Sequence, residues 1–139
     1  MTDREVYDSY TFVHLSNVAE YNFAVHLDGQ LGDHQDIPGG IELPDETWEI
    51  VVHRLYMPIF IDKLKHRFPN CCIYSNYDPT KPSAAEIEQF GSYNRAKELK
   101  EISFLYRAQY MEGAWDTAAK YYSLRAKEIR GGAVAAEIV

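Results

Sequence analysis

The five histidines of this 139-residue chain are the first residues to test for metal or acid–base chemistry, and their spacing favours neither. No His-x-x-x-His or Glu-x-x-His pair occurs, although such pairs place two functional groups on one face of a helix. Glu49 and His53 are four residues apart, as are Asp62 and His66, which is typical of weak surface ion pairs on a helix. We therefore expect no metal site.

The two cysteines, Cys71 and Cys72, are adjacent. A disulfide between neighbours needs strained geometry, and a zinc site needs further ligands that the sequence does not space correctly. We expect two small apolar side chains in a reducing compartment. The first ten residues are charged and lead into no apolar run, and no stretch reaches the length of a membrane span. We expect a soluble protein made in the cytoplasm, with no membrane partner.

Motifs that bind phosphate or activate a nucleophile do not occur. Gly39-Gly40 is followed by Ile41 and lacks the Lys-Ser or Lys-Thr of a phosphate-binding loop. Neither a Gly-x-Ser-x-Gly nor a Cys-Gly motif is present, and the carboxylates of Glu98 and Glu101 lie among lysines, as on a solvated helix face. We expect no catalytic residue, no cofactor and no enzyme, although a triad built from distant positions would leave no local motif.

Tyrosine close to arginine is the pattern that does suggest a function. Both residue types are enriched at protein interfaces. Stacking on single-stranded nucleic acid uses the same types, but the net charge of −7 disfavours that reading. The sequence predicts a subunit interface formed by Tyr106, Tyr110, Trp115, Tyr121, Tyr122 and Arg125.

The spacing of apolar residues predicts mainly helices as the elements that position these side chains. Residues 1–9 are expected to be frayed, residues 10–15 to form a short strand or an extended lead-in, and residues 18–28 to form a helix. A loop over residues 29–44 contains four glycines and several acids. A helix over residues 45–68, capped by Asp45 and kinked or split at Pro58, is expected to follow, before a short strand at residues 71–74.

Stronger signals mark the C-terminal half of the chain. Ser83 and Glu86 match a capping box for a short helix that reaches Phe90. Helices are predicted over residues 93–112 and 114–130, with Gly113 between them and Gly131-Gly132 at the end.

The fold class expected from these elements is mostly α. It is a small helical bundle with two long helices, a long acidic loop and an extended C-terminal arm, and the pattern also allows a minor β-hairpin. Residues 1–130 are predicted to form a single helical domain. Residues 131–139 are predicted to be either a frayed tail or a flexible arm that docks on a partner through Ala133, Val134, Ile138 and Val139.

Charge is distributed unevenly along the chain. Residues 1–50 hold eleven of the 21 acidic residues and one of the 14 basic residues, so their net charge is −10 against +3 for residues 51–139. Such a split suggests two faces with different partners, or an acidic solvated loop without further meaning.

The last two predicted helices carry a family resemblance. Residues 95–129 read RAKELKEISFLYRAQYMEGAWDTAAKYYSLRAKEI: a Lys-Glu-rich helix leading to Leu-Tyr, a break with Gly113 and Trp115, and a Tyr-rich helix with a basic end. This pattern resembles the paired C-terminal helices of head–tail adaptor (connector or neck) proteins of tailed bacteriophages. It covers about a quarter of the chain.

The resemblance implies a structural virion protein that forms an oligomeric ring below the portal and lines the DNA exit channel. Its partners would be the portal protein, downstream neck and tail proteins, and other copies of itself, with DNA only as a passing, non-specific occupant. The C-terminal arm would dock on the portal. Asp33, Asp36 and Glu42 would face the channel or the next ring, where acidic groups repel DNA phosphates.

A second hypothesis starts from the acidic first third alone. A small acidic inhibitor, or decoy, could occupy the nucleic-acid site of a host enzyme, with carboxylates spaced like phosphates. Binding of that kind would weaken steeply as salt is added.

Overall fold

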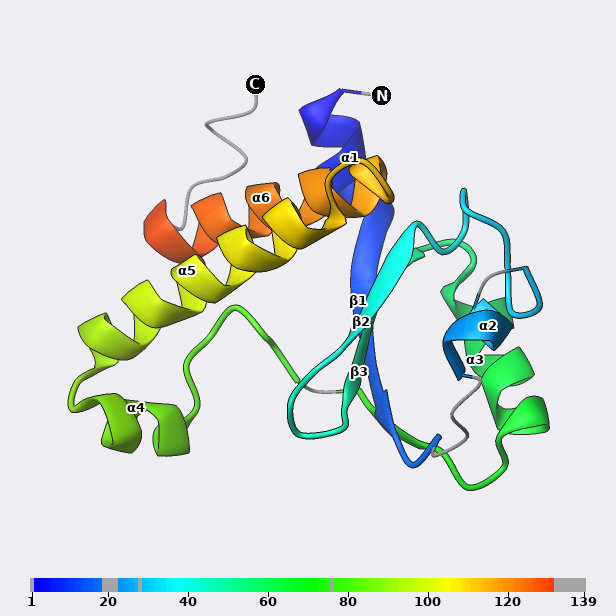
Figure 1. Cartoon of the computed structure of the whole chain (residues 1–139), viewed down its shortest axis with the longest axis horizontal. Helices are drawn as coiled ribbons and strands as arrows, with labels where there is room; N and C mark the ends of the chain where they lie inside the picture. The colour runs from blue at the N-terminus through cyan, green and yellow to red at the C-terminus, as the bar shows by residue number, and fades with distance from the viewer. Residues whose placement is uncertain (1, 19–22, 28, 76, 132–139) are drawn as a thin grey trace. The chain divides into compact units, whose positions relative to one another are not determined.

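The computed structural model describes residues 2–18, 23–27, 29–75 and 77–131, and it divides the chain into two compact units (Figure 1). We call Ser9–Tyr77 the sheet unit. We call Met1–Asp8 together with Asp78–Val139 the helical unit. That the two units form a single domain stays a prediction.

The sheet unit contains a four-stranded antiparallel sheet in the order β2-β3-β1-β4. The strands are β1 (Tyr10–Ser16), β2 (Gly39–Glu42), β3 (Trp48–His53) and β4 (Cys72–Tyr74). Two helices, α2 (Phe23–Leu27) and α3 (Met57–Arg67), complete the unit. The mostly α bundle that the sequence predicts is therefore wrong, because half of the chain is built on a sheet.

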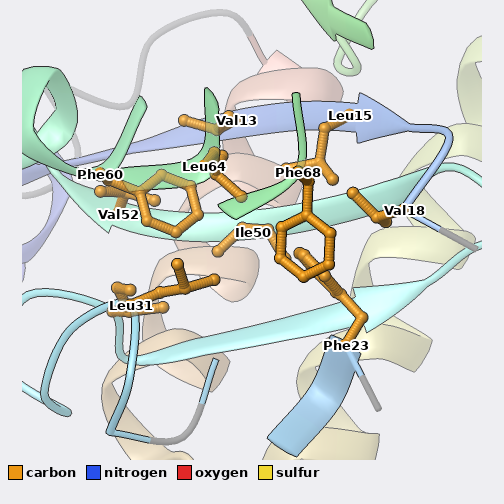
Figure 2. Packing of buried hydrophobic residues seen from close by; sticks show 11 residues of the cluster. Val13, Leu15, Val18, Phe23, Leu31, Ile50, Val52, Phe60, Leu64 and Phe68 are labelled. Atoms are coloured by element: carbon orange, nitrogen blue, oxygen red, sulfur yellow. The ribbon is translucent and has the colours of Figure 1, made fainter. Parts of the chain in front are cut away.

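One face of this sheet packs against helices and forms an apolar core (Figure 2). Phe60 and Leu64 of α3 are fully buried, and they meet strand residues that alternate along β1 and β3, as one face of a sheet requires. Phe23 of α2 closes the core beside Phe68, with ring centroids 5.3 Å apart. The strand residues in this core are Val13, Leu15, Ile50 and Val52.

The prediction of one helix over residues 45–68 is wrong. Residues 48–53 form β3, and the helix begins only at Met57. Ile50, Val51 and Val52 are all fully buried, so both faces of the strand are covered. Such a run shows no alternation and can be mistaken for a helix. Pro58 lies in the first turn of α3, where its missing N–H costs no hydrogen bond, so it does not interrupt the helix.

Two smaller corrections concern the N-terminal half. The loop predicted over residues 29–44 is shorter, because Gly39–Glu42 form β2 and pair with β3. Residues expected to be frayed include α1 (Asp3–Ser9). The strands predicted at residues 10–15 and 71–74 are confirmed as β1 and β4.

The helical unit follows its local sequence signals closely, except at α1. It contains α1, α4 (Ala84–Phe90), α5 (Tyr93–Met111) and α6 (Asp116–Gly131). The capping box is present, with Ser83 Oγ accepting from the Glu86 N–H and Glu86 Oε1 accepting from the Ser83 N–H. Gly91 ends α4 and Gly113 follows α5, both with positive φ. α5 and α6 lie side by side (Figure 1).

Candidate protein-binding surface

Helix α5 carries apolar residues around its whole circumference. On one side Ala96, Phe104, Ala108 and Met111 are buried. On the other side four large apolar residues remain exposed: Ile102 at 51%, Leu105 at 49%, Tyr106 at 72% and Tyr110 at 65%. We call the exposed residues Arg95, Glu98, Ile102, Leu105, Tyr106, Gln109 and Tyr110 the outer face of α5.

Packing on the buried side fixes which side of α5 points outward. The rings of Phe104 and Tyr122 meet edge to face, with centroids 5.5 Å apart. The guanidinium of Arg107 lies over the Phe104 ring at 5.1 Å from its centroid. Because α6 occupies this side, the outer face has no covering helix within the described residues of the helical unit.

An ion pair between Glu86 and Lys100 links α4 to the buried side of α5. Lys100 is 9% exposed, and its Nζ donates to both carboxylate oxygens of Glu86, at 2.9 and 3.0 Å. Burial alone would raise the pKa of Glu86, but the bonds from the Ser83 N–H and the Lys100 ammonium lower it below its ordinary value. Glu86 therefore caps α4 and neutralises a buried lysine with one carboxylate.

The six residues predicted at a subunit interface separate into two groups. Tyr106 and Tyr110 are strongly exposed on the outer face of α5, and Trp115, after the Gly113 break, is half-buried. Tyr121 and Tyr122 are fully buried. Their burial removes these two from any surface that a second subunit could reach, which corrects the prediction at both positions.

Arg125 also acts inside the helical unit. Its side chain is 14% exposed, and its Nε lies 2.6 Å from Glu128 Oε2. It donates to Tyr121 Oη at 2.7 Å. Burial and the Glu128 carboxylate raise the pKa of Tyr7 in α1, which places that phenol in the same network. This network joins α1 to α6, so we assign Arg125 to structure and not to a partner.

The acidic loop residues lie in two places within the sheet unit. Asp33 Oδ1 accepts from the N–H groups of Gln35 and Asp36, which closes a tight turn. Partial burial and the neighbouring Asp33 raise the pKa of Asp36. Glu42 instead ends β2 and lines a cavity. Their orientation toward a channel stays a prediction, and the arm residues Ala133, Val134, Ile138 and Val139 lie outside the described residues.

The cavity at the end of the sheet has a volume of about 750 Å³. Its lining includes Glu42, Asp45, Glu46, Trp48 and Tyr74, and none of the described lining residues is basic. Its charge would suit a cation, but an acidic lining alone does not define a ligand. No described group of three or more His, Cys, Asp or Glu side chains is placed to hold a metal ion.

The hairpin beside this cavity holds Glu46 in an unusual backbone conformation. Glu46 has φ of 67°, in the left-handed region that glycine or asparagine normally occupies at this point of a three-residue hairpin loop. The loop is closed by bonds from the Glu46 N–H to Leu43 O at 3.0 Å and from the Leu43 N–H to Thr47 O at 2.8 Å.

Glu46→Gly should therefore raise the free energy of unfolding by about 0.5–1 kcal/mol, because relief of the strain exceeds the backbone entropy that glycine adds. Urea denaturation followed by circular dichroism measures this change. Glu88→Gly, in the middle of α4, is the contrasting variant and should destabilise by about 1 kcal/mol. Equal destabilisation by both variants would show that Glu46 makes contacts that outweigh its strain.

A buried polar pair in the sheet unit was not foreseen from the sequence. His14 and Glu49 face each other across β1 and β3, on the side of the sheet away from Ile50 and Val13. His14 Nε2 and Glu49 Oε2 lie 2.8 Å apart, and the side chains are 2% and 1% exposed. The Tyr77 ring meets His14 edge to face at 4.6 Å. From the sequence we expected Glu49 to pair with His53 on one face of a helix. That prediction is wrong, because both residues lie in β3.

Comparisons with protein-family models, with curated proteins and with solved structures found no match to this chain. No helix among the residues that the structure describes has the length and apolarity needed to cross a membrane. The outer face of α5, with its four large exposed apolar side chains, is the feature from which we argue a function.

Proposed function

We propose that this chain is a non-enzymatic structural protein that binds other proteins through the outer face of α5. The observation that carries the proposal is the exposure of Ile102, Leu105, Tyr106 and Tyr110 on one side of one helix. Large apolar side chains grouped on a surface mark interaction sites, and tyrosine is among the residues enriched there.

We further propose that its place of action is the neck of a tailed-phage virion, as a head–tail adaptor. This step is supported by the α5–α6 hairpin, which spans the residues of the family resemblance and contains the Gly113 break. The partners would be the portal protein, neighbouring copies of the chain and downstream neck proteins. DNA would pass through without specific contacts.

Leu105→Glu should abolish partner binding through this face, because it introduces a charge at the centre of the apolar group. We expect at least a tenfold loss of binding to the portal protein of the same phage, measured by size-exclusion chromatography and electron microscopy of the mixture. Leu55→Glu is the matched control, since Leu55 is 83% exposed and lies in the sheet unit.

The two variants make the proposal falsifiable. Binding should survive in Leu55→Glu and be lost in Leu105→Glu. Equal binding by both would show that the outer face of α5 is not the contact surface. Absence of any complex with the unaltered chain would contradict the proposed place in the neck.

A further inference from the structure

The outer face of α5 contains a heptad pattern that faces solvent. Arg95, Glu98, Ile102, Leu105 and Gln109 follow one another at alternating intervals of three and four residues, and all are exposed. Glu112, which caps α5 and is also exposed, continues the series. In a coiled coil such positions form the seam that faces a partner helix. The buried side of α5 already contacts α6, so this second seam is available to another molecule.

The geometry points to a second copy of this chain as the occupant of the seam, with the two α5 helices antiparallel. A twofold axis midway between Ser103 and Phe104 pairs each seam residue with a residue of complementary chemistry. Ile102 meets Leu105 of the second copy, and Leu105 meets Ile102 in return. Each contact occurs twice, as a twofold interface requires.

Charge complementarity extends this pairing to both ends of the helix. Outside the apolar centre, Glu98 lies opposite Gln109 of the second copy, where amide N–H groups can donate to the carboxylate. At the ends, Arg95 lies opposite Glu112 of the second copy. A parallel arrangement would instead place Arg95 on Arg95 and Glu98 on Glu98, so like charges would repel at both positions.

The contacts that these residues make within one chain are weak enough to rearrange. Arg95 Nη1 lies 3.2 Å from Glu98 Oε2, but the two side chains are 53% and 60% exposed, and exposed pairs contribute little. A single helix-to-helix contact lies at the lower end of specific interfaces, about 1,200 Å². Because only Ile102 and Leu105 are apolar among the seam residues of each copy, we expect a weak dimer, with a dissociation constant on the order of 1–100 μM.

This inference rests on the proposed function, because both use the outer face of α5 for contacts between copies of the chain. It adds the geometry of that contact. A twofold contact closes at two copies, so it forms a dimer and cannot by itself grow into a ring. The free protein should be a dimer. Because the portal would bind the same face, the dimer must dissociate when the chain docks, and ring formation on a portal would need a contact outside α5.

A charge exchange tests the register directly. Sedimentation equilibrium at about 50 mM salt, where ion pairs are least screened, should give the dimer dissociation constant of the unaltered chain. Arg95→Glu and Glu112→Arg should each weaken the dimer about tenfold, because each places two like charges together twice. The double variant Arg95→Glu/Glu112→Arg should return to within about threefold of the original value. Glu88→Arg, on the exposed surface of α4, is the control and should leave the dimer unchanged.

The possible results separate this inference from the proposed function. A dimer without rescue in the double variant would overturn the antiparallel register. Assemblies larger than a dimer that dissolve in Leu105→Glu would overturn the twofold geometry and leave α5 as a contact surface. A monomer up to about 1 mM overturns the inference even if the chain still binds a portal through Leu105. A rescued dimer that binds no portal supports the inference and contradicts the neck location.

Discussion

Replacement of Glu49 by leucine should lower the free energy of unfolding by about 1–3 kcal/mol, although leucine is apolar and nearly the same size. The reason is that the substitution leaves His14 buried without the carboxylate 2.8 Å from its Nε2. A buried polar group that loses its partner still carries the free-energy cost of removal from water, and no hydrogen bond offsets that cost. Urea denaturation followed by circular dichroism measures the change.

The matched variant is the double substitution His14→Leu/Glu49→Leu. Because it removes both polar groups at once, it should be much less destabilising than either single substitution, and the two effects should not add. If the double variant lost as much free energy of unfolding as the two single variants together, His14 and Glu49 would contribute independently to stability. The structural assignment of a coupled pair across β1 and β3 would then be wrong.

Tyr122→Ala should destabilise the protein by about 3–5 kcal/mol, because Tyr122 is fully buried and packs edge to face on Phe104. The substitution leaves a cavity between α5 and α6 that the two helices can only partly fill. Thermal or urea unfolding measures the loss of stability. Tyr122→Phe, which keeps the ring, should be far less destabilising than Tyr122→Ala.

Tyr106→Ala is the contrasting substitution on the neighbouring helix. Tyr106 is 72% exposed, so its removal should change the stability of the monomer by no more than about 0.5 kcal/mol. Its effect should be on association with a partner. Similar destabilisation by both substitutions would contradict the division of these tyrosines into a buried group and a surface group.

Helices α4, α5 and α6 could be predicted because their signals are local, whereas α1 was not predicted. The capping box of Ser83 and Glu86, the glycines at 91 and 113, and the apolar spacing over residues 93–130 each act within one or two helix turns. Such signals are the same in the isolated segment and in the folded protein. The predicted helices therefore agree with α4, α5 and α6 to within a few residues.

The sheet unit could not be predicted in the same way, because strands are completed by partners that are distant in sequence. β3 pairs with β1, and His14 meets Glu49 across 35 positions of the chain. The acids before Trp48 and the apolar residues after it also fit the start of a helix. Only pairing on both edges, with burial of Ile50, Val51 and Val52, makes the strand the stable state.

By itself, the sequence determined that residues 93–130 form two long helices rich in tyrosine, because helix formation depends on neighbours three and four positions away. It did not determine which tyrosines face outward. Apolar residues occur on every side of α5, so its pattern alone cannot distinguish an inner from an outer side. The tertiary structure decided this, because Phe104, Ala108 and Met111 pack in the interior and thereby leave Ile102, Leu105, Tyr106 and Tyr110 exposed. The surface on which the proposed function rests is thus a product of packing between helices.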